Sequence, residues 1–131
     1  MEFVVKKHSK KEFHPTYAKW LESQNFPYIA PEVLPENVFV CYVYEIPCYC
    51  IWFYHSDSRM AQLGWPASNK NVNYKTKQGA FKFLYERVSA YAKKKKYLRL
   101  FTTSATQSVI DAMLEAGYVE GEQCKHFYKI L

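Results

Sequence analysis

Residues Lys75 to Tyr118 read KTKQGAFKFLYERVSAYAKKKKYLRLFTTSATQSVIDAMLEAGY and carry the clearest pattern of helices and strands in the chain. Apolar residues recur at three- and four-residue spacing from Ala80 onward, which predicts an amphipathic helix over 75–96. Four lysines, Lys93–Lys96, close this helix, as cations do near a helix C-terminus. A helix that begins on a basic, glycine-containing segment and leads into a strand is suited to hold an anionic ligand.

The second half of this stretch predicts a strand and a further helix. Residues 97–103 are rich in aromatic and β-branched side chains, which is typical of a strand. Ser104 and Gln107 have the spacing of a capping box, so the second helix is expected to begin there, and Gly117 is expected to end it. The helix carries one apolar stripe, formed by Val109, Ile110, Met113 and Leu114.

Working outward, the rest of the chain predicts mainly strands. We expect a strand at 3–7, a helix at 15–24 that Ser9 could cap, a loop at 25–36, a hairpin of 38–44 and 48–54, a strand at 60–65 ended by Pro66, a loop at 67–74 and a closing strand at 123–131. Both hairpin strands are apolar on both faces, which indicates a central position between helices. The chain is therefore predicted to be a single domain, 1–131, of the α/β (α+β) class, with a mixed, mostly antiparallel sheet of about five to six strands.

Composition limits the functional classes. Hydrophobic residues make up 49% and aromatic residues 18% of the chain, which is typical of a folded protein. The net charge of +6 favours acidic partners, such as a phosphorylated cofactor, nucleic acid or an acidic protein surface, but a solvated basic face without a partner explains it equally well. No apolar run has the length of a membrane span, and no signal-peptide pattern opens the chain. We therefore expect no membrane association. The four cysteines follow no secreted scaffold spacing, so we expect reduced thiols and a cytoplasmic location.

Two polar clusters follow or lie within the predicted strands. His55 and Asp57 come directly after the second hairpin strand, and either could act as a general base for an amine. The alternative is a strand-end turn in which Ser and Asp side chains bond the local backbone. Cys48 and Cys50 lack a second pair or a nearby histidine, so the sequence predicts no metal site.

The tract Lys93–Lys96 allows a similar pair of explanations. Its lysines could contact phosphate, which leaves nucleic acid open as a partner. A solvated helix end explains them as well, because lysines in a last turn already have a structural reason to be there. The twelve tyrosines are spread over every element, and no basic-aromatic motif of an RNA-binding sheet appears.

The predicted order of strands and helices resembles that of the GNAT superfamily of N-acetyltransferases. Most of the match lies in 37–131. Its last part looks like the corresponding part of that superfamily: the strand Leu98–Thr103, the helix after it, and the segment Glu115-Ala116-Gly117-Tyr118 that ends this helix. The resemblance implies acetyl-CoA as a cofactor and an unidentified amine or protein as acyl acceptor. The residues implied to bind the cofactor are Leu63, Gly64 and Trp65 on a strand, and Lys75, Lys77, Gln78, Gly79 and Ala80 at the start of a helix.

The sequence also departs from the GNAT pattern. Gln78 stands where the first glycine of the pyrophosphate loop belongs, and Gly79 comes one position late. Met113 occupies the position of the usual general-acid tyrosine, and Thr106 that of the usual asparagine. Methionine cannot protonate a leaving thiolate.

Two classes of function remain from the sequence. The first is an acyl-CoA-dependent N-acetyltransferase-like enzyme with degenerate cofactor and acid motifs. The second is a catalytically inactive GNAT-fold protein with a binding or structural role. Short, aromatic chains of this kind resemble those of tailed bacteriophages, in which the second role would be host takeover or a place in the virion.

Overall fold

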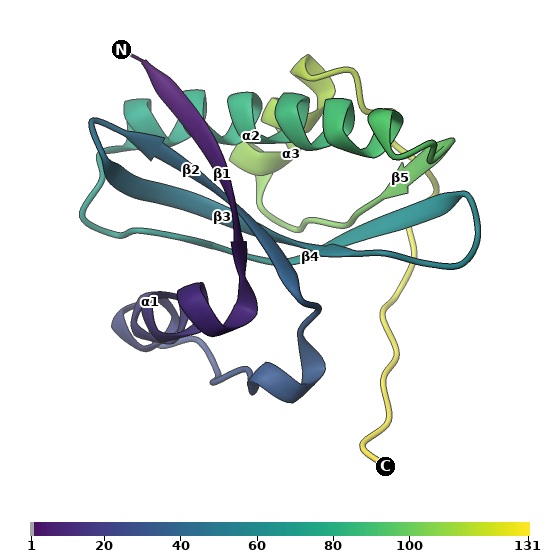
Figure 1. Cartoon of the computed structure of the whole chain (residues 1–131), viewed down its shortest axis with the longest axis horizontal. Coiled ribbons are helices and arrows are strands. Elements are labelled where there is room, and N and C mark those ends of the chain that lie inside the picture. Colours follow the sequence, from purple (N-terminus) through teal and green to yellow (C-terminus); the bar gives the residue numbers. More distant parts are fainter. Residues whose placement is uncertain (1) are drawn as a thin grey trace.

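The computed structural model describes residues 2–131 (Figure 1). The strands are β1 (Phe3–Ser9), β2 (Asn37–Val43), β3 (Ile46–Tyr54), β4 (Met60–Ser68) and β5 (Arg99–Phe101). The helices are α1 (Lys10–Ser23), α2 (Tyr74–Lys94) and α3 (Gln107–Glu115), with a short 3-10 turn at Pro31–Val33.

The strands form one sheet in the order β1-β2-β3-β4-β5. Neighbours pair antiparallel except β4 and β5, which pair in parallel. Figure 1 shows α2 and α3 on one face of this sheet and α1 on the other. The prediction of an α+β fold with a mixed, mostly antiparallel sheet is confirmed. Among the residues described, no helix is both long and apolar enough to cross a membrane.

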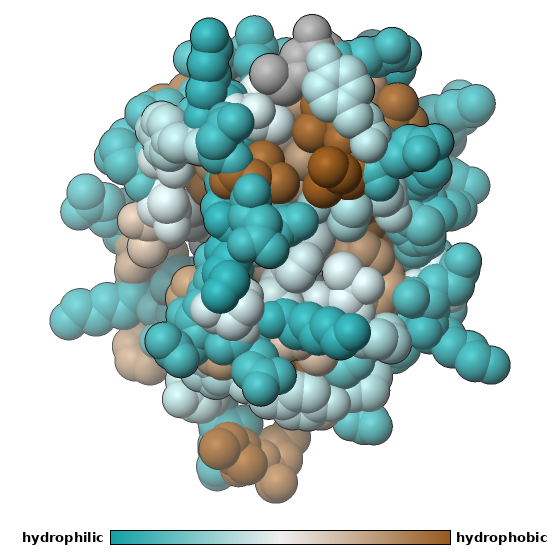
Figure 2. All heavy atoms as spheres, turned by 90° about the vertical axis from the view of Figure 1, so that its left-hand side faces the viewer, coloured by the Kyte–Doolittle hydropathy of each residue, from teal (hydrophilic) through white to brown (hydrophobic). Residues whose placement is uncertain are grey.

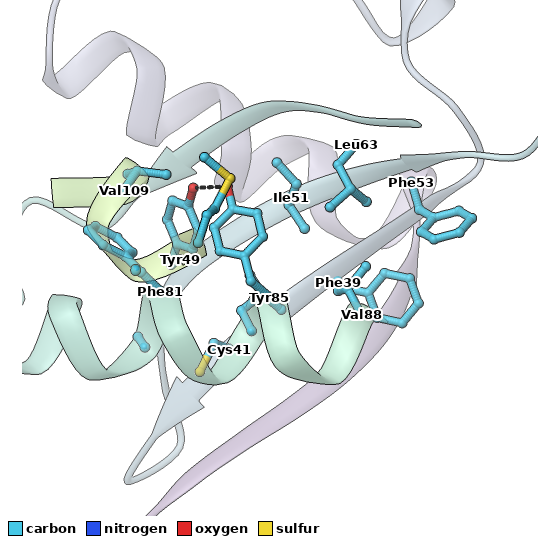
Figure 3. Packing of buried hydrophobic residues seen from close by; sticks show 14 of the residues in the cluster. Phe39, Cys41, Tyr49, Ile51, Phe53, Leu63, Phe81, Tyr85, Val88 and Val109 are labelled. Carbon is cyan, nitrogen blue, oxygen red and sulfur yellow. Dashed lines mark hydrogen bonds between the residues drawn. The ribbon is translucent and has the colours of Figure 1, made fainter. Parts of the chain in front are cut away.

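The two faces of the sheet carry separate hydrophobic clusters. Towards α2 and α3, β2 and β3 contribute side chains such as Phe39, Ile51 and Phe53 (Figure 3). Towards α1, the same strands contribute Val38 and Trp52. The two-sided apolar pattern of the predicted hairpin therefore did indicate central strands, since helices cover both faces.

The first helix starts earlier than the sequence predicted. Ser9 is the N-cap: its hydroxyl accepts from the amide of Glu12, and the Glu12 carboxylate accepts from the amide of Ser9. This capping box begins the helix at Lys10 and leaves Pro15 inside it rather than near its start. Capping therefore decided the boundary, because it satisfies amides that the helix itself leaves free.

Other predicted boundaries were wrong near the end of β4 and in the region of β5. Pro66 does not end β4, which continues to Ser68 through an irregularity described below. Of the predicted strand 97–103, only the three residues of β5 form a strand, and they pair with the start of β4. The Ser104–Gln107 capping box does not form, because Thr106 is the N-cap of α3 and the Gln107 amide donates to Asp111 instead.

The predicted closing strand, 123–131, does not form. These residues are exposed and have no regular structure, and Phe127, Tyr128 and Ile130 are 87–90% exposed. The edge of β5 is three residues long, so it offers few backbone groups to a sixth strand. Gly117, in contrast, ends α3 as predicted, with a positive φ of 92° that favours glycine.

Candidate active site

A β-bulge near the end of β4 is the main irregularity of the sheet. Cys50 pairs with Ala67 and Trp52 with Gly64, so three steps along β4 face two along β3. Trp65 lies in this bulge and has a φ of 53°. The extra residue changes which face the side chains meet, because strand side chains alternate. Leu63 packs on the α2 side, whereas Ala67 packs on the α1 side, although both are odd-numbered.

β4 and β5 pair only over the first part of β4. Met60, Ala61 and Gln62 pair with β5, and no described residue pairs with the same edge of β4 further along. The two strands therefore separate towards the bulge, and backbone amides on this edge of β4 are free to donate to a ligand. Pro66 has no N–H and cannot be one of these donors.

Two side chains of α1 hold the bulged end of β4. The Tyr17 hydroxyl donates to the carbonyl of Trp65 at 2.9 Å, and the Gln24 amide donates to the carbonyl of Ser68 at 2.7 Å. Tyr17 is fully buried, and burial raises the pKa of its hydroxyl far above the ordinary value, so it stays a donor. No sequence pattern indicates this contact, since Tyr17 reads as one apolar residue of a helix face.

The start of α2 follows directly on this end of β4. The Asn73 side chain caps the helix by accepting from the amide of Thr76 at 2.9 Å. The amides of Tyr74 and Lys75, in the first turn, have no partner within the helix. The lysines predicted to bind a cofactor, Lys75 and Lys77, both lie on this first turn. Figure 2 views this end of the molecule, and hydrophilic side chains cover most of it.

The other residues predicted at this loop lie inside the helix. Gln78 has a buried amide nitrogen without a hydrogen-bond partner. A Cβ on Gly79 would lie 2.6 Å from the ring of Phe3, so the missing side chain makes room for β1. Ala80 is fully buried against the sheet. The structure thus gives Gly79 and Ala80 roles in packing, and Gln78 is the residue of this group with an unused donor.

His55 and Asp57 lie at the opposite end of α2. The His55 Nδ1 atom is 3.0 Å from the Tyr97 hydroxyl, and the His55 ring is 6.2 Å from that of Tyr91. Tyr91 is separated from Lys75 by about 24 Å along the helix, at 1.5 Å per residue. The structure therefore does not bring the two predicted base candidates together with the predicted cofactor-binding residues.

The position at which GNAT proteins usually carry a general-acid tyrosine lies in the core of this chain. Met113 is 8% exposed and packs with Val109 in the cluster between α3, α2 and the sheet. The hydroxyls of Tyr49 and Tyr85 are 2.9 Å apart in the same cluster (Figure 3). Burial raises the pKa of Tyr85 to about 12. The described part of α3 carries no tyrosine that could act as an acid.

This architecture is similar to that of solved acetyltransferase structures. An aminoglycoside acetyltransferase from an uncultured soil metagenomic sample superposes with a TM-score of 0.71 at 16% identity, over 98% of this chain and 96% of the other. A ribosomal-protein-alanine N-acetyltransferase from Brucella melitensis biovar Abortus 2308 superposes with a TM-score of 0.70 at 12% identity, over 99% and 100%. The chain has a GNAT fold. No protein-family model and no curated protein matches the sequence.

A third GNAT structure was solved with the cofactor. It is the aminoglycoside N-acetyltransferase AAC(6')-Iy in complex with CoA, with a TM-score of 0.65 and 15% identity over 98% of this chain and 95% of the other. At such identities the likeness shows the GNAT fold alone. Any assignment of function to this chain must therefore come from its own bulge, strand edge and helix start.

Among the residues described, no group of three or more His, Cys, Asp or Glu side chains could hold a metal ion. Cys41, Cys48 and Cys50 are buried free thiols. Burial raises the pKa of Cys41 to about 12, so this thiol stays protonated at neutral pH.

Proposed function

We propose that this GNAT-fold protein is an acyl-CoA-dependent N-acetyltransferase that acts slowly. The observation that carries the proposal is the end of β4, where a bulge at Trp65 and an unpaired strand edge lie directly before the first turn of α2. This arrangement combines free backbone amides with a cationic helix start, and both favour a phosphorylated, carbonyl-containing ligand.

The chain's own residues would divide the work between the two parts of this site. The first-turn amides of α2 and the ammonium groups of Lys75 and Lys77 would hold the pyrophosphate. The Gln78 amide nitrogen lacks an acceptor but is buried, so it would need to move to reach a ligand oxygen. Acetyl-CoA, when bound, supplies an acetyl group activated as a thioester. A free amide of β4 near Leu63–Trp65 would polarise the thioester carbonyl, and Tyr17 keeps that backbone in position.

Proton transfer is the weak part of this site. Met113 cannot donate a proton, and neither His55 nor Asp57 lies near the start of α2. Positioning of the amine and polarisation of the carbonyl remain as sources of rate enhancement. A missing general acid or base lowers a rate by a factor of roughly a hundred to ten thousand. We therefore expect the rate to rise with pH, as the acceptor amine loses its proton to solvent.

The test is isothermal titration of acetyl-CoA into the purified protein, followed by mass spectrometry of an amine library incubated with both. Binding together with acetylated product supports the proposal. Absence of binding at millimolar acetyl-CoA contradicts it.

The alternative is a GNAT-fold protein without catalysis, acting as a binding or structural component. It is favoured by Gly79, which makes room for Phe3 where the GNAT loop would need it for a ligand, and by the buried Met113. Binding of acetyl-CoA without any product from the library would select this alternative. The acceptor, the cytoplasmic location and the likeness to bacteriophage proteins stay predictions.

A further inference from the structure

The end of the molecule opposite the candidate active site concentrates the positive charge of the chain. We call this surface the basic end, and it consists of Lys7, Arg59, Lys93–Lys96 and Arg99. Within 55–59 and 93–101, the one acidic residue is Asp57. The chain has 18 Lys and Arg against 12 Asp and Glu residues, so outside the basic end and Asp57 the numbers are 11 and 11. The seven cations of the basic end thus account for the whole excess of +6.

The cations of the basic end come from separate elements that the fold brings together. The ammonium groups of Lys7, from β1, and Lys95, after α2, lie 5.5 and 5.7 Å from the ring centroid of Tyr91. Arg59, before β4, donates from Nε to the carbonyl of Lys96, and Arg99 begins β5. In the sequence, only Lys93–Lys96 stood out as a cluster.

None of these cations is neutralised within the described chain. The ion pairs of residues 2–131 are His8 with Glu12 and Lys82 with Glu86, and neither includes the basic end. Burial, Lys95 and Lys7 together lower the pKa of His55, which lies beside Tyr91 and Tyr97. The positive charges of Lys95 and Lys7 therefore act on the imidazole of His55, in addition to burial.

The width of the basic end indicates the size of its ligand. The strands that carry Lys7 and Arg99, β1 and β5, are separated by four strand spacings across the sheet, about 19 Å at 4.8 Å each. One phosphate group covers a small part of that width, whereas a nucleic-acid strand, with a phosphate at every nucleotide, places several along it. A lipid surface fits less well, because α2 buries its apolar face on the sheet and leaves no such face to lie in a membrane.

We propose that the basic end binds the phosphodiester backbone of a nucleic acid. The contact does not depend on acetyl transfer, since it uses the end of α2 opposite the candidate active site. Recognition is by charge, because Lys7 and Lys95 already lie against Tyr91 and limit its use for base stacking.

The first test is fluorescence anisotropy with a labelled single-stranded RNA of about 20 nucleotides, a length that exceeds the width of the basic end. Lys93→Gln/Lys94→Gln/Lys95→Gln should weaken binding at least tenfold. It should also reduce the slope of log K against log salt by about 2, from ~0.7 per lost phosphate contact. The matched control, Lys11→Gln/Lys19→Gln/Lys70→Gln, removes three charges outside the basic end and should change affinity less than threefold.

The second test uses His55 as a reporter in NMR. RNA bound at the basic end should raise the pKa of His55, because phosphates offset the potential of Lys7 and Lys95. Three results would overturn the proposal: no RNA binding, equal weakening by both triple variants, or an unchanged His55 pKa under saturating RNA. Tighter, Lys93–Lys95-dependent binding to vesicles of phosphatidylcholine with phosphatidylserine than to RNA would also overturn it and identify a membrane surface instead.

Discussion

The two ends of β4 are stabilised in different ways. At its start, Met60–Gln62 pair with β5 on one edge, and Gln62 also pairs with Tyr54 of β3 on the other. At its end, Trp65–Ser68 have β3 on one edge, no strand on the other, and hydrogen bonds from Tyr17 and Gln24 to their carbonyls. The start is an ordinary part of the sheet, whereas the end keeps a bulged backbone and unused amides.

This difference shows how a sheet can leave a strand edge open without losing order. Side chains from α1 take over part of the work of a missing strand, but they bond carbonyls and leave amides on the open edge. Chemistry that needs a backbone donor is therefore expected at the end of β4 and not at its start. The predictions below test this contrast.

The largest effect is expected from deleting Trp65. Removal of the extra residue turns Ala67 away from the α1-side cluster and takes away the acceptor of the buried Tyr17 hydroxyl. We expect a loss of at least about 3 kcal/mol in the free energy of unfolding, measured by chemical denaturation. The control is deletion of Asn71 from the exposed loop before α2, which should cost far less. Equal losses in both deletions would show that the bulge has no special role.

Charge reversal at either end of α2 should affect cofactor binding very differently. Lys75→Glu/Lys77→Glu should weaken CoA binding at least tenfold, or about 1.4 kcal/mol, because these groups would face the pyrophosphate. Lys94→Glu/Lys95→Glu, with the same change of charge, should leave CoA affinity within about threefold. Calorimetric titration gives both values, and thermal melts check that each variant folds. A similar loss in both variants would mean that net charge, rather than the start of α2, attracts CoA.

Tyr17→Phe should loosen one end of β4 and spare the other. The substitution removes the donor to Trp65 and retains the ring, so the expected cost is about 0.5–1.5 kcal/mol. Hydrogen exchange should speed up for the amides of residues 64, 65, 67 and 68 and stay unchanged for those of 60–62. If acetyl transfer is present, it should slow without a change in fold. Uniform acceleration along β4 would contradict a local role.

The smallest effect concerns His55, at the far end of α2. Its pKa is lowered in the folded protein, so its contribution to stability is present above pH 6.5, the ordinary value, and is lost as pH falls below it. His55→Gln should flatten this dependence in thermal melts between pH 7.5 and 5, a change that we expect to be slight because the residue is exposed.

The same variant separates the two ends for catalysis. Because His55 lies beside Tyr91, which is about 24 Å along α2 from Lys75, His55→Gln should leave any acetyl transfer unchanged. Asp57→Asn is the matched variant in the same turn and should behave alike. A fall in rate for either would restore the prediction that they act as general bases.

Local sequence patterns are sufficient to predict the class of fold and most of its helices and strands. The two-sided apolar hairpin, the helix from the Lys75 region to the lysine tract and the Gly117 stop depend on local patterns, such as periodicity, propensity and chain termination. The prediction that the basic helix start holds an anionic ligand also rests on a local feature.

Features that depend on contacts between residues distant in the chain could not be predicted from local patterns. The bulge at Trp65 is held by Tyr17, 48 residues away, and no local pattern encodes that hydrogen bond. The need for glycine at position 79 follows from the approach of the Phe3 ring. The distance between His55 and the start of α2 follows from the sheet, because β3 and β4 are antiparallel and the turn after β3 lies far from the end of β4. Residues 123–131 have the composition of a strand but form none, because the edge strand β5 is only three residues long. A strand is stabilised by its neighbour rather than by its own residues.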